Sequence, residues 1–341
     1  MDNTFLPTGG LRLTNIRYAQ SLLKASCCFV PMSADKIEAD MMMCCAFCGI
    51  TSEVDDIKKL KNCTACYLVK YCSIKCQKEH RPQHKRECKK RAAELRDDLL
   101  FKQPESSHLG DCPICMLPLP LDLKESAMKG CCSKMICIGC EYGNLKREFD
   151  DGLDASCPFC RHPAPESRTE AITSEKERAE LGDPVALRQV GTLCILDSDH
   201  KGAFGNFMKA AELGDAHAHY QLSLLYHDGH GVEKEEKKRL YHLEKAVIGG
   251  HPDARYSLGC KEWKDRQHDR AIKHFIIAAK LGSDDSLAAL KQLYEKEIIS
   301  KEDFATALRA HQGAVDATKS PQREASEEFL RGAGHFGVYK Y

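Results

Sequence analysis

The sequence predicts a multi-domain protein in which two small cysteine-rich α+β modules precede an all-α solenoid of helical repeats. Three observations support this fold class. Cysteines cluster twice, first from Cys45 to Cys88 and then from Cys112 to Cys160. Beyond Ser174 they almost stop, and short motifs ending in glycine recur at intervals of 32, 36 and 32 residues, at Gly182, Gly214, Gly250 and Gly282. Periods of this length are typical of stacked helical hairpins.

Composition narrows the class of protein. A chain of 341 residues has room for two or three domains of about 150 residues each. Its 50 basic and 50 acidic residues balance, which does not favour nucleic acid as a general partner. We find neither a basic-then-apolar signal segment nor a run of about 20 apolar residues, so we expect no membrane association. The 20 cysteines are then expected to be reduced metal ligands in a cytoplasmic and/or nuclear protein.

The expected domain boundaries follow from these shifts in composition. The apolar residues around Leu11, Leu13 and Ile16 could form a short amphipathic helix or stay disordered, and the stretch from Thr318 to Tyr341 has little periodicity. Termini are usually loose unless they are tied down. We expect a flexible leader at 1–43, a first zinc module at 44–91, a helical linker at 92–111, a second zinc module at 112–163, a linker at 164–180, helical repeats at 181–315 and a flexible tail at 316–341.

The first module offers four ligand pairs. Two C-x-x-C turns and two pairs with a spacing of four residues supply Cys45, Cys48, Cys63, Cys66, Cys72, Cys76, His84 and Cys88. Zn²⁺ takes four such ligands in a tetrahedron, and a spacing of four places two side chains on one helix face. Two competing ligands exist, since Cys44 adjoins Cys45 and His80 lies one turn before His84. A peptide this small and polar needs metal to fold.

The stretch Tyr71-Cys72-Ser73-x-x-Cys76-Gln77-x-x-His80, followed by His84-x-x-x-Cys88, resembles the MYND zinc finger. The resemblance implies interleaved sites, with Cys45, Cys48, Cys72 and Cys76 on one zinc and Cys63, Cys66, His84 and Cys88 on the other. It also implies binding of short proline-containing peptides and no catalysis. The chain departs from the family at Arg81, where Trp is common, and in the long loop between Cys48 and Cys63.

Basic residues gather at the end of this module, in Lys85-Arg86 and Lys89-Lys90-Arg91. Such a run can contact nucleic acid or an acidic partner, or it can be a solvated helix face. Aromatic residues that would stack on bases are scarce there, which favours the solvated face.

The second module contains eight cysteines, at Cys112, Cys115, Cys131, Cys132, Cys137, Cys140, Cys157 and Cys160. Their order resembles a RING domain of the eight-cysteine type. The resemblance implies one zinc on Cys112, Cys115, Cys137 and Cys140, and a second zinc on Cys131, Cys132, Cys157 and Cys160. With the first module, this gives about four Zn²⁺ per chain. Lys134 stands where many RING domains carry a histidine ligand, so the adjacent pair Cys131-Cys132 must supply both ligands.

RING domains carry no catalytic residue; they position a ubiquitin-charged conjugating enzyme. The resemblance implies contacts with that enzyme or with ubiquitin through Ile114, Pro158 and Arg161. The bulky apolar residue that commonly follows the sixth ligand by four positions is replaced by Asn144, so Leu145 is expected to serve instead.

The repeats resemble the Sel1-like class, best at Gly229-His-Gly231-Val232 and Ala254-x-Tyr256-x-Leu258-Gly259. Asp183-Pro184, Asp215 and Pro252 are expected to start helices, and Ser300 a final capping helix. The predicted core contains Ala211, Ala246, Ala254, Ala279, Leu222, Leu225, Tyr226, Leu240, Leu243, Phe275 and Leu290. The spacing of His217, His219, His227 and His230 lacks a complete ligand set, which favours ordinary core and loop roles.

Together these features predict a RING-type ubiquitin ligase whose MYND finger and repeats recruit protein partners. The alternative is a non-catalytic scaffold in which all three modules are binding surfaces, and the nucleus is one location that this alternative allows. MYND fingers also accompany methyltransferase domains, but the remaining stretches of this chain are too short for one.

Overall fold

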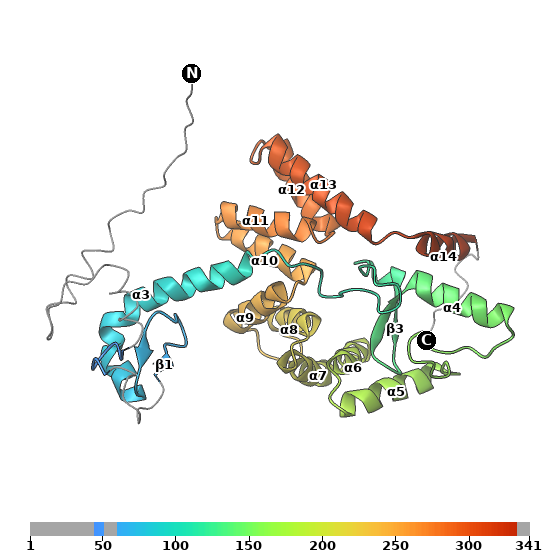
Figure 1. Ribbon diagram of the computed structural model, residues 1–341, viewed down its shortest axis with the longest axis horizontal. Coiled ribbons are helices and arrows are strands. Elements are labelled where there is room, and N and C mark those ends of the chain that lie inside the picture. Colours follow the sequence, from blue (N-terminus) through green and yellow to red (C-terminus); the bar gives the residue numbers. More distant parts are fainter. Residues whose placement is uncertain (1–43, 51–59, 333–341) are drawn as a thin grey trace, which may run out of the picture. The chain divides into compact units, whose positions relative to one another are not determined.

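The computed structural model describes residues 44–50 and 60–332 (Figure 1). It divides into two compact units, with the boundary between Leu95 and Arg96. The predicted leader at 1–43 lies outside the described residues. Within the described part, no helix is long and apolar enough to cross a membrane.

The first unit is built around its cysteines. Strands β1 (Lys61–Asn62) and β2 (Lys70–Tyr71) pair antiparallel, and helix α3 (Ile74–Leu100) follows them. Among the residues of this unit that the structure describes, the buried side chains are Cys45, Cys63, Cys66 and Tyr71. So small an apolar core cannot hold a fold by itself, which is why the ligand groups are its centre.

The end of α3 belongs to the second unit. Leu100 is fully buried against Leu243, Val247 and Leu258, and the buried Arg255 donates hydrogen bonds to the carbonyl oxygens of Leu100 (2.5 Å) and Val247 (3.0 Å). The helix stops there, so the prediction of a helical linker at 92–111 is correct only as far as residue 100. The following residues are irregular and run along the repeats.

The second cysteine module contains a hairpin and one helix. A short 3₁₀ turn, η1 (Leu123–Glu125), leads into strands β3 (Ser126–Lys129) and β4 (Lys134–Cys137), which pair antiparallel with Ser126 opposite Cys137. Helix α4 (Ile138–Asp150) follows directly. Leu119 and Ile136 pack among the buried cysteines of the module.

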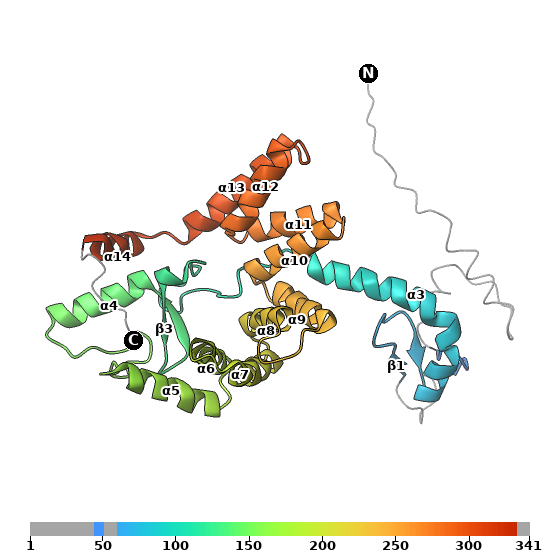
Figure 2. The ribbon, with the colours of Figure 1, turned by 180° about the vertical axis from the view of Figure 1, so that it is seen from behind.

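The rest of the second unit is a series of antiparallel helix pairs, seen from two sides in Figures 1 and 2. Consecutive helices from α5 to α13 pack on one another, whereas α14 packs on α4. Their bounds are α5 (Arg168–Glu180), α6 (Pro184–Leu196), α7 (His200–Glu212), α8 (Ala216–Asp228), α9 (Glu236–Ile248), α10 (Pro252–Lys264), α11 (His268–Ala279), α12 (Asp284–Glu295), α13 (Lys301–Ala317) and α14 (Pro321–Gly332).

The recurring glycines end helices as predicted, because each adopts a left-handed backbone, with φ between +80° and +92°. The next helix then begins on an N-cap: Asp183, Asp215, His251 or Ser283. Ser300 caps α13 in the same way. These local signals were sufficient to place the helix starts.

The predicted core residues of the repeats are buried, except that Leu240 is partly buried at the edge of its cluster. Close packing also requires Gly259 on α10. A methyl group there would lie 2.7 Å from Cε1 of Phe275, and Gly191 meets Phe207 at 2.6 Å in the same way. Small residues therefore set how closely the paired helices approach.

Two segments, one predicted as a linker and one as a flexible tail, contain helices. The predicted linker at 164–180 contains α5, which packs on α6. The predicted tail at 316–341 contains α14, which lies beside α4 in both views (Figures 1 and 2). Tyr142 and Phe329 are in ring contact at 5.0 Å between centroids. The sequence did not predict helix α14, because its most buried residues, Arg323 and Ser326, are polar and give no hydrophobic pattern.

Candidate metal centres

The same metal-binding turn occurs four times, at the C-x-x-C pairs that open with Cys45, Cys63, Cys112 and Cys157. In each turn, the amide of the residue after the second cysteine donates to the carbonyl of the first, at 2.8–2.9 Å. That residue has a left-handed backbone in every case: Gly49, Tyr67, Met116 and Arg161. Three of them are not glycine, so the backbone conformation is imposed by the turn.

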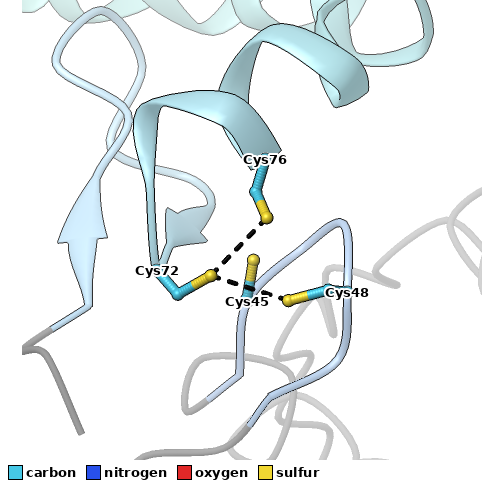
Figure 3. A group of neighbouring side chains, drawn as sticks. All are labelled: Cys45, Cys48, Cys72 and Cys76. Carbon is cyan, nitrogen blue, oxygen red and sulfur yellow. Dashed lines mark hydrogen bonds between the residues drawn. The ribbon is translucent and has the colours of Figure 1, made fainter.

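The first centre joins one turn to the start of α3 (Figure 3). Cys45 and Cys48 face Cys72 and Cys76, with Sγ–Sγ distances of 3.6 Å for Cys48–Cys72 and 3.5 Å for Cys72–Cys76. Zinc–sulfur bonds of about 2.3 Å give a tetrahedral edge of about 3.8 Å. The four sulfurs are therefore spaced for one zinc ion.

The second centre uses the helix spacing. His84 and Cys88, one turn apart on α3, meet Cys63 and Cys66. The Sγ atoms of Cys63 and Cys88 are 3.7 Å apart, and Nε2 of His84 lies 3.2 Å from Sγ of Cys66. Both four-ligand groups of this module are complete without the competing residues Cys44 and His80. His80 instead places Nδ1 3.1 Å from the Tyr71 hydroxyl and stacks on His84.

The second module forms two further groups with the predicted membership. Cys112, Cys115, Cys137 and Cys140 make one, and Cys131, Cys132, Cys157 and Cys160 make the other. Sγ–Sγ distances are 3.7 Å for Cys115–Cys137 and 3.4 Å for Cys131–Cys160. Cys131 and Cys132 can join one group because the chain turns sharply at this point. Ser133 has a left-handed backbone conformation, and its amide donates to the carbonyl oxygen of Lys129 at 2.7 Å.

Turn amides favour the thiolate that a metal needs. Burial raises the pKa of Cys45, but hydrogen bonds from the amides of Cys48, Cys72 and Phe47 outweigh it and lower that pKa to about 6. A hydrogen bond from the Cys137 thiol, against opposing burial, lowers the pKa of Cys112 to about 4, and turn amides add to this. All four groups combine soft sulfur donors with near-tetrahedral spacing, which fits Zn²⁺.

The predicted contact residues of the second module are arranged unequally. Ile114 is 41% exposed, Leu145 is partly buried and Pro158 is buried. Arg161 is exposed and donates to Oδ1 of Asn144 at 2.6 Å. Asn144 is buried, and its amide donates to the carbonyl of Ser156 at 3.1 Å. Asn144 therefore ties α4 to the last zinc turn instead of facing a partner.

Sequence reasoning missed the group that supports the first zinc turn of this module. Arg323 on α14 is only 4% exposed and donates to the carbonyls of Pro118 (2.8 Å), Leu117 (3.3 Å) and Thr318 (2.6 Å). Its Nη2 also lies 3.4 Å from Sγ of Cys115. No local signal marks such a contact, because the partners are about 200 residues apart in sequence.

Comparison with known proteins gives one family match. Residues 45–88 match the MYND finger model, so this segment is a MYND finger and Zn²⁺ is its cofactor. Human histone-lysine N-methyltransferase SMYD3 is 59% identical over 32 residues, which cover 9% of this chain and 8% of that protein. A match this short gives no basis for assigning the activity of that protein to this chain.

The longer matches are distant. DAP3-binding cell death enhancer 1 is 25% identical in mouse and 30% identical in rat, over 46% of this chain and 38% of each relative. The chain thus spans well under half the length of these relatives.

Among solved structures, a Sel1 repeat protein from Oxalobacter formigenes is 20% identical, with a TM-score of 0.39 over 51% of this chain and 72% of that one. The protective antigen c5321 of uropathogenic Escherichia coli, which has an SLR fold, is 19% identical, with a TM-score of 0.35 over 59% and 42%. The helix pairs described above define the repeat solenoid. The protein therefore combines a MYND finger, a second cysteine module and helical repeats, and the finger and the repeats are protein-interaction elements.

Proposed function

We propose that this protein is a RING-type ubiquitin ligase whose MYND finger and repeats recruit protein partners, in the cytoplasm and/or the nucleus. The observation that carries the proposal is the pair of exposed apolar side chains on the two zinc turns of the second module. Ile114 and Phe159 are each more than 40% exposed although they lie beside structural cysteines. An apolar residue held rigidly on a zinc turn is suited to anchor a conjugating enzyme.

Catalysis in this proposal is positional, and no side chain forms a covalent intermediate. Ile114 and Phe159 contact the conjugating enzyme, buried Pro158 holds the turn that carries Phe159, and the Arg161 guanidinium donates to that enzyme and to ubiquitin. A planar guanidinium suits such a bridge because it presents several donors in a fixed plane. Asn144 already accepts from Arg161 at 2.6 Å, which restricts the guanidinium before any partner arrives.

The test is discharge of ubiquitin from charged conjugating enzymes onto free lysine, using the full chain. We expect acceleration by the wild type, loss of it in Ile114→Ala with zinc content unchanged, and loss in Cys112→Ala with one zinc missing. Leu153→Ala is the matched control, because Leu153 is also exposed on the second module but lies outside the zinc turns. No acceleration across a broad panel of conjugating enzymes would overturn the ligase proposal.

A non-catalytic scaffold is the second candidate, and one observation favours it. Helix α14 covers part of α4, since methyl groups at Gly139 and Gly143 would lie within 3 Å of Arg323 and Gln322. A covered helix leaves less surface for a conjugating enzyme. In the scaffold, the second module is a structural part of the repeat unit, and the binding surfaces are the MYND finger and the solenoid.

For the MYND finger we propose short proline-containing peptides as ligands. A cleft of about 240 Å³ in the first unit is lined by Tyr71, Gln77, Arg81 and Lys85, among others. Arg81 adds positive charge where the family often has Trp, so ligands with a nearby acidic residue are favoured. A peptide array tests this with the full chain and Gln77→Ala. Uniform failure of proline-containing peptides would contradict the proposal.

A further inference from the structure

Three histidines from distant segments meet inside the second unit. His108 lies in the irregular segment after α3, His217 in the first turn of α8, and His251 at the N-cap of α10. Each has a ring nitrogen within 4.8 Å of one on the other two. The sequence spacing of the repeat histidines gave no complete ligand set, because the first ligand comes from outside the repeats.

The closest pair has the separation of two ligands on one ion. Nε2 of His251 lies 3.1 Å from Nδ1 of His217. Zinc–nitrogen bonds of about 2.0–2.1 Å give a tetrahedral edge of about 3.4 Å. The third ring, His108, stacks on His251 at 4.0 Å between centroids, so a turn of that ring is needed to aim a nitrogen at the same point.

Hydrogen bonding among the protein groups accounts for only two of the three rings. The Ala254 amide donates to Nδ1 of His251 at 3.4 Å, which leaves a proton on Nε2 to donate to His217. With its Nδ1 accepting, His217 carries its proton on Nε2, which lies 2.9 Å from the Gln221 side-chain amide and donates to that amide once it is turned to present its oxygen. Both ring nitrogens of His108 are buried and have no partner. Because an unpaired buried polar atom is costly, His108 points to a missing ligand.

We propose that His108, His217 and His251 bind a divalent transition-metal ion, with Zn²⁺ the first candidate, separate from the four cysteine centres. The ion replaces the proton shared by His217 and His251. His217 keeps its proton on Nε2, where the Gln221 amide accepts it through its oxygen once the amide is turned, and an outer contact of this kind typically orients a metal-bound histidine. The proton of His251 moves to Nδ1, and the long contact from Ala254 is the one given up.

The surroundings suit a neutral three-histidine site. Burial lowers the pKa of His108 to about 3 and of His217 to about 4, so lone pairs are available at neutral pH. The nearby cation, Arg188, is paired with Asp215 at 3.2 Å. His108 and His217 also line a cavity of about 770 Å³, which leaves room for water at a fourth position.

Metal at this point would fasten the segment that carries the second cysteine module to the repeats. The amide of His108 already donates to the carbonyl of Gly250 at 3.1 Å, so the backbone is docked before the ion binds. An ion held from three segments so far apart in sequence closes long loops, which is where a cross-link stabilises most. This role does not depend on ligase activity.

The experiment is a metal count on the full chain, purified with its cysteine-bound zinc, equilibrated with micromolar Zn²⁺ and then desalted. We expect the wild type to hold one zinc per chain more than His108→Ala and His217→Gln. His219→Gln is the matched control, since His219 pairs with His242 at 2.9 Å without a third ligand. Added Co²⁺ should give a visible spectrum without thiolate charge-transfer bands in the wild type and the control only.

Equal zinc counts in the wild type and in both ligand variants would overturn the proposal, as would a thiolate-type Co²⁺ spectrum. The two ligand variants lie on different segments, and circular dichroism verifies their fold. His108→Ala removes a ring without hydrogen bonds, so it is the variant least liable to unfold. If neither variant folds, the zinc count of the wild type decides. A count no higher than the four cysteine groups can hold would mean that the histidines bind no zinc.

Discussion

The two cysteine modules share one metal-binding turn and differ in what surrounds it. Among the described residues of the MYND finger, Tyr71 is the one buried side chain beside the cysteines, and an exposed basic face of α3 runs alongside. The second module is joined to the rest of its unit through Arg323 on α14 and through Arg178 on α5, whose Nε donates to the Ser133 hydroxyl at 2.9 Å. The same zinc-binding turn therefore occurs in the MYND finger, which is a small module by itself, and in the second module, which is packed into a larger unit.

The comparison predicts unequal consequences of losing one ligand. Cys137→Ser should remove one zinc and lower the free energy of unfolding of the second unit by more than about 4 kcal/mol, the range typical of a lost structural metal. Cys63→Ser should unfold the MYND finger and leave the second unit within about 0.5 kcal/mol of wild type. Zinc counting with region-resolved hydrogen exchange measures both. Equal losses in the second unit would contradict the distinction.

A smaller effect is expected where α14 meets the second module. Arg323→Ala leaves three carbonyls without their charged donor, so we expect a loss of about 2–3 kcal/mol and rapid hydrogen exchange throughout α14. Arg331→Ala is the control on the same helix. Its guanidinium is exposed and lies 3.7 Å from Glu327, a surface pair worth less than about 1 kcal/mol. Unchanged exchange of α14 in Arg323→Ala would show that the helix is held by other contacts.

The smallest predicted effects come from two helical glycines of the solenoid. Gly259→Ala places a methyl group against Phe275 and should cost about 1–3 kcal/mol. Gly205→Ala meets no atom within 4 Å and should stabilise α7 by about 0.5–1 kcal/mol. Urea unfolding measures the two changes, and the same sign for both would contradict the packing described for the solenoid.

The parts of the fold that follow local rules were predictable from sequence. Ligand spacing identified the cysteine pairs, the MYND and RING resemblances supplied their grouping, and glycine stops with Asp or Ser caps defined the helix starts. Contacts between distant segments were not predictable. Asn144 stands where the RING family often has a bulky apolar contact residue, and sequence alone did not show that it bonds Ser156. Helix α14 gave no signal because the residues that it buries are polar. His108 could not be paired with His217 and His251 until the chain path placed them together.

The central claim is that both cysteine modules are two-zinc centres, and a thiol-specific mercurial titration tests it most directly. Such a reagent displaces zinc from cysteine ligands and leaves zinc held by histidine alone in place. With fifteen ligand cysteines in four groups, we predict release of four zinc ions per chain as those thiols react. Release of only two would contradict the claim and restrict zinc to one module.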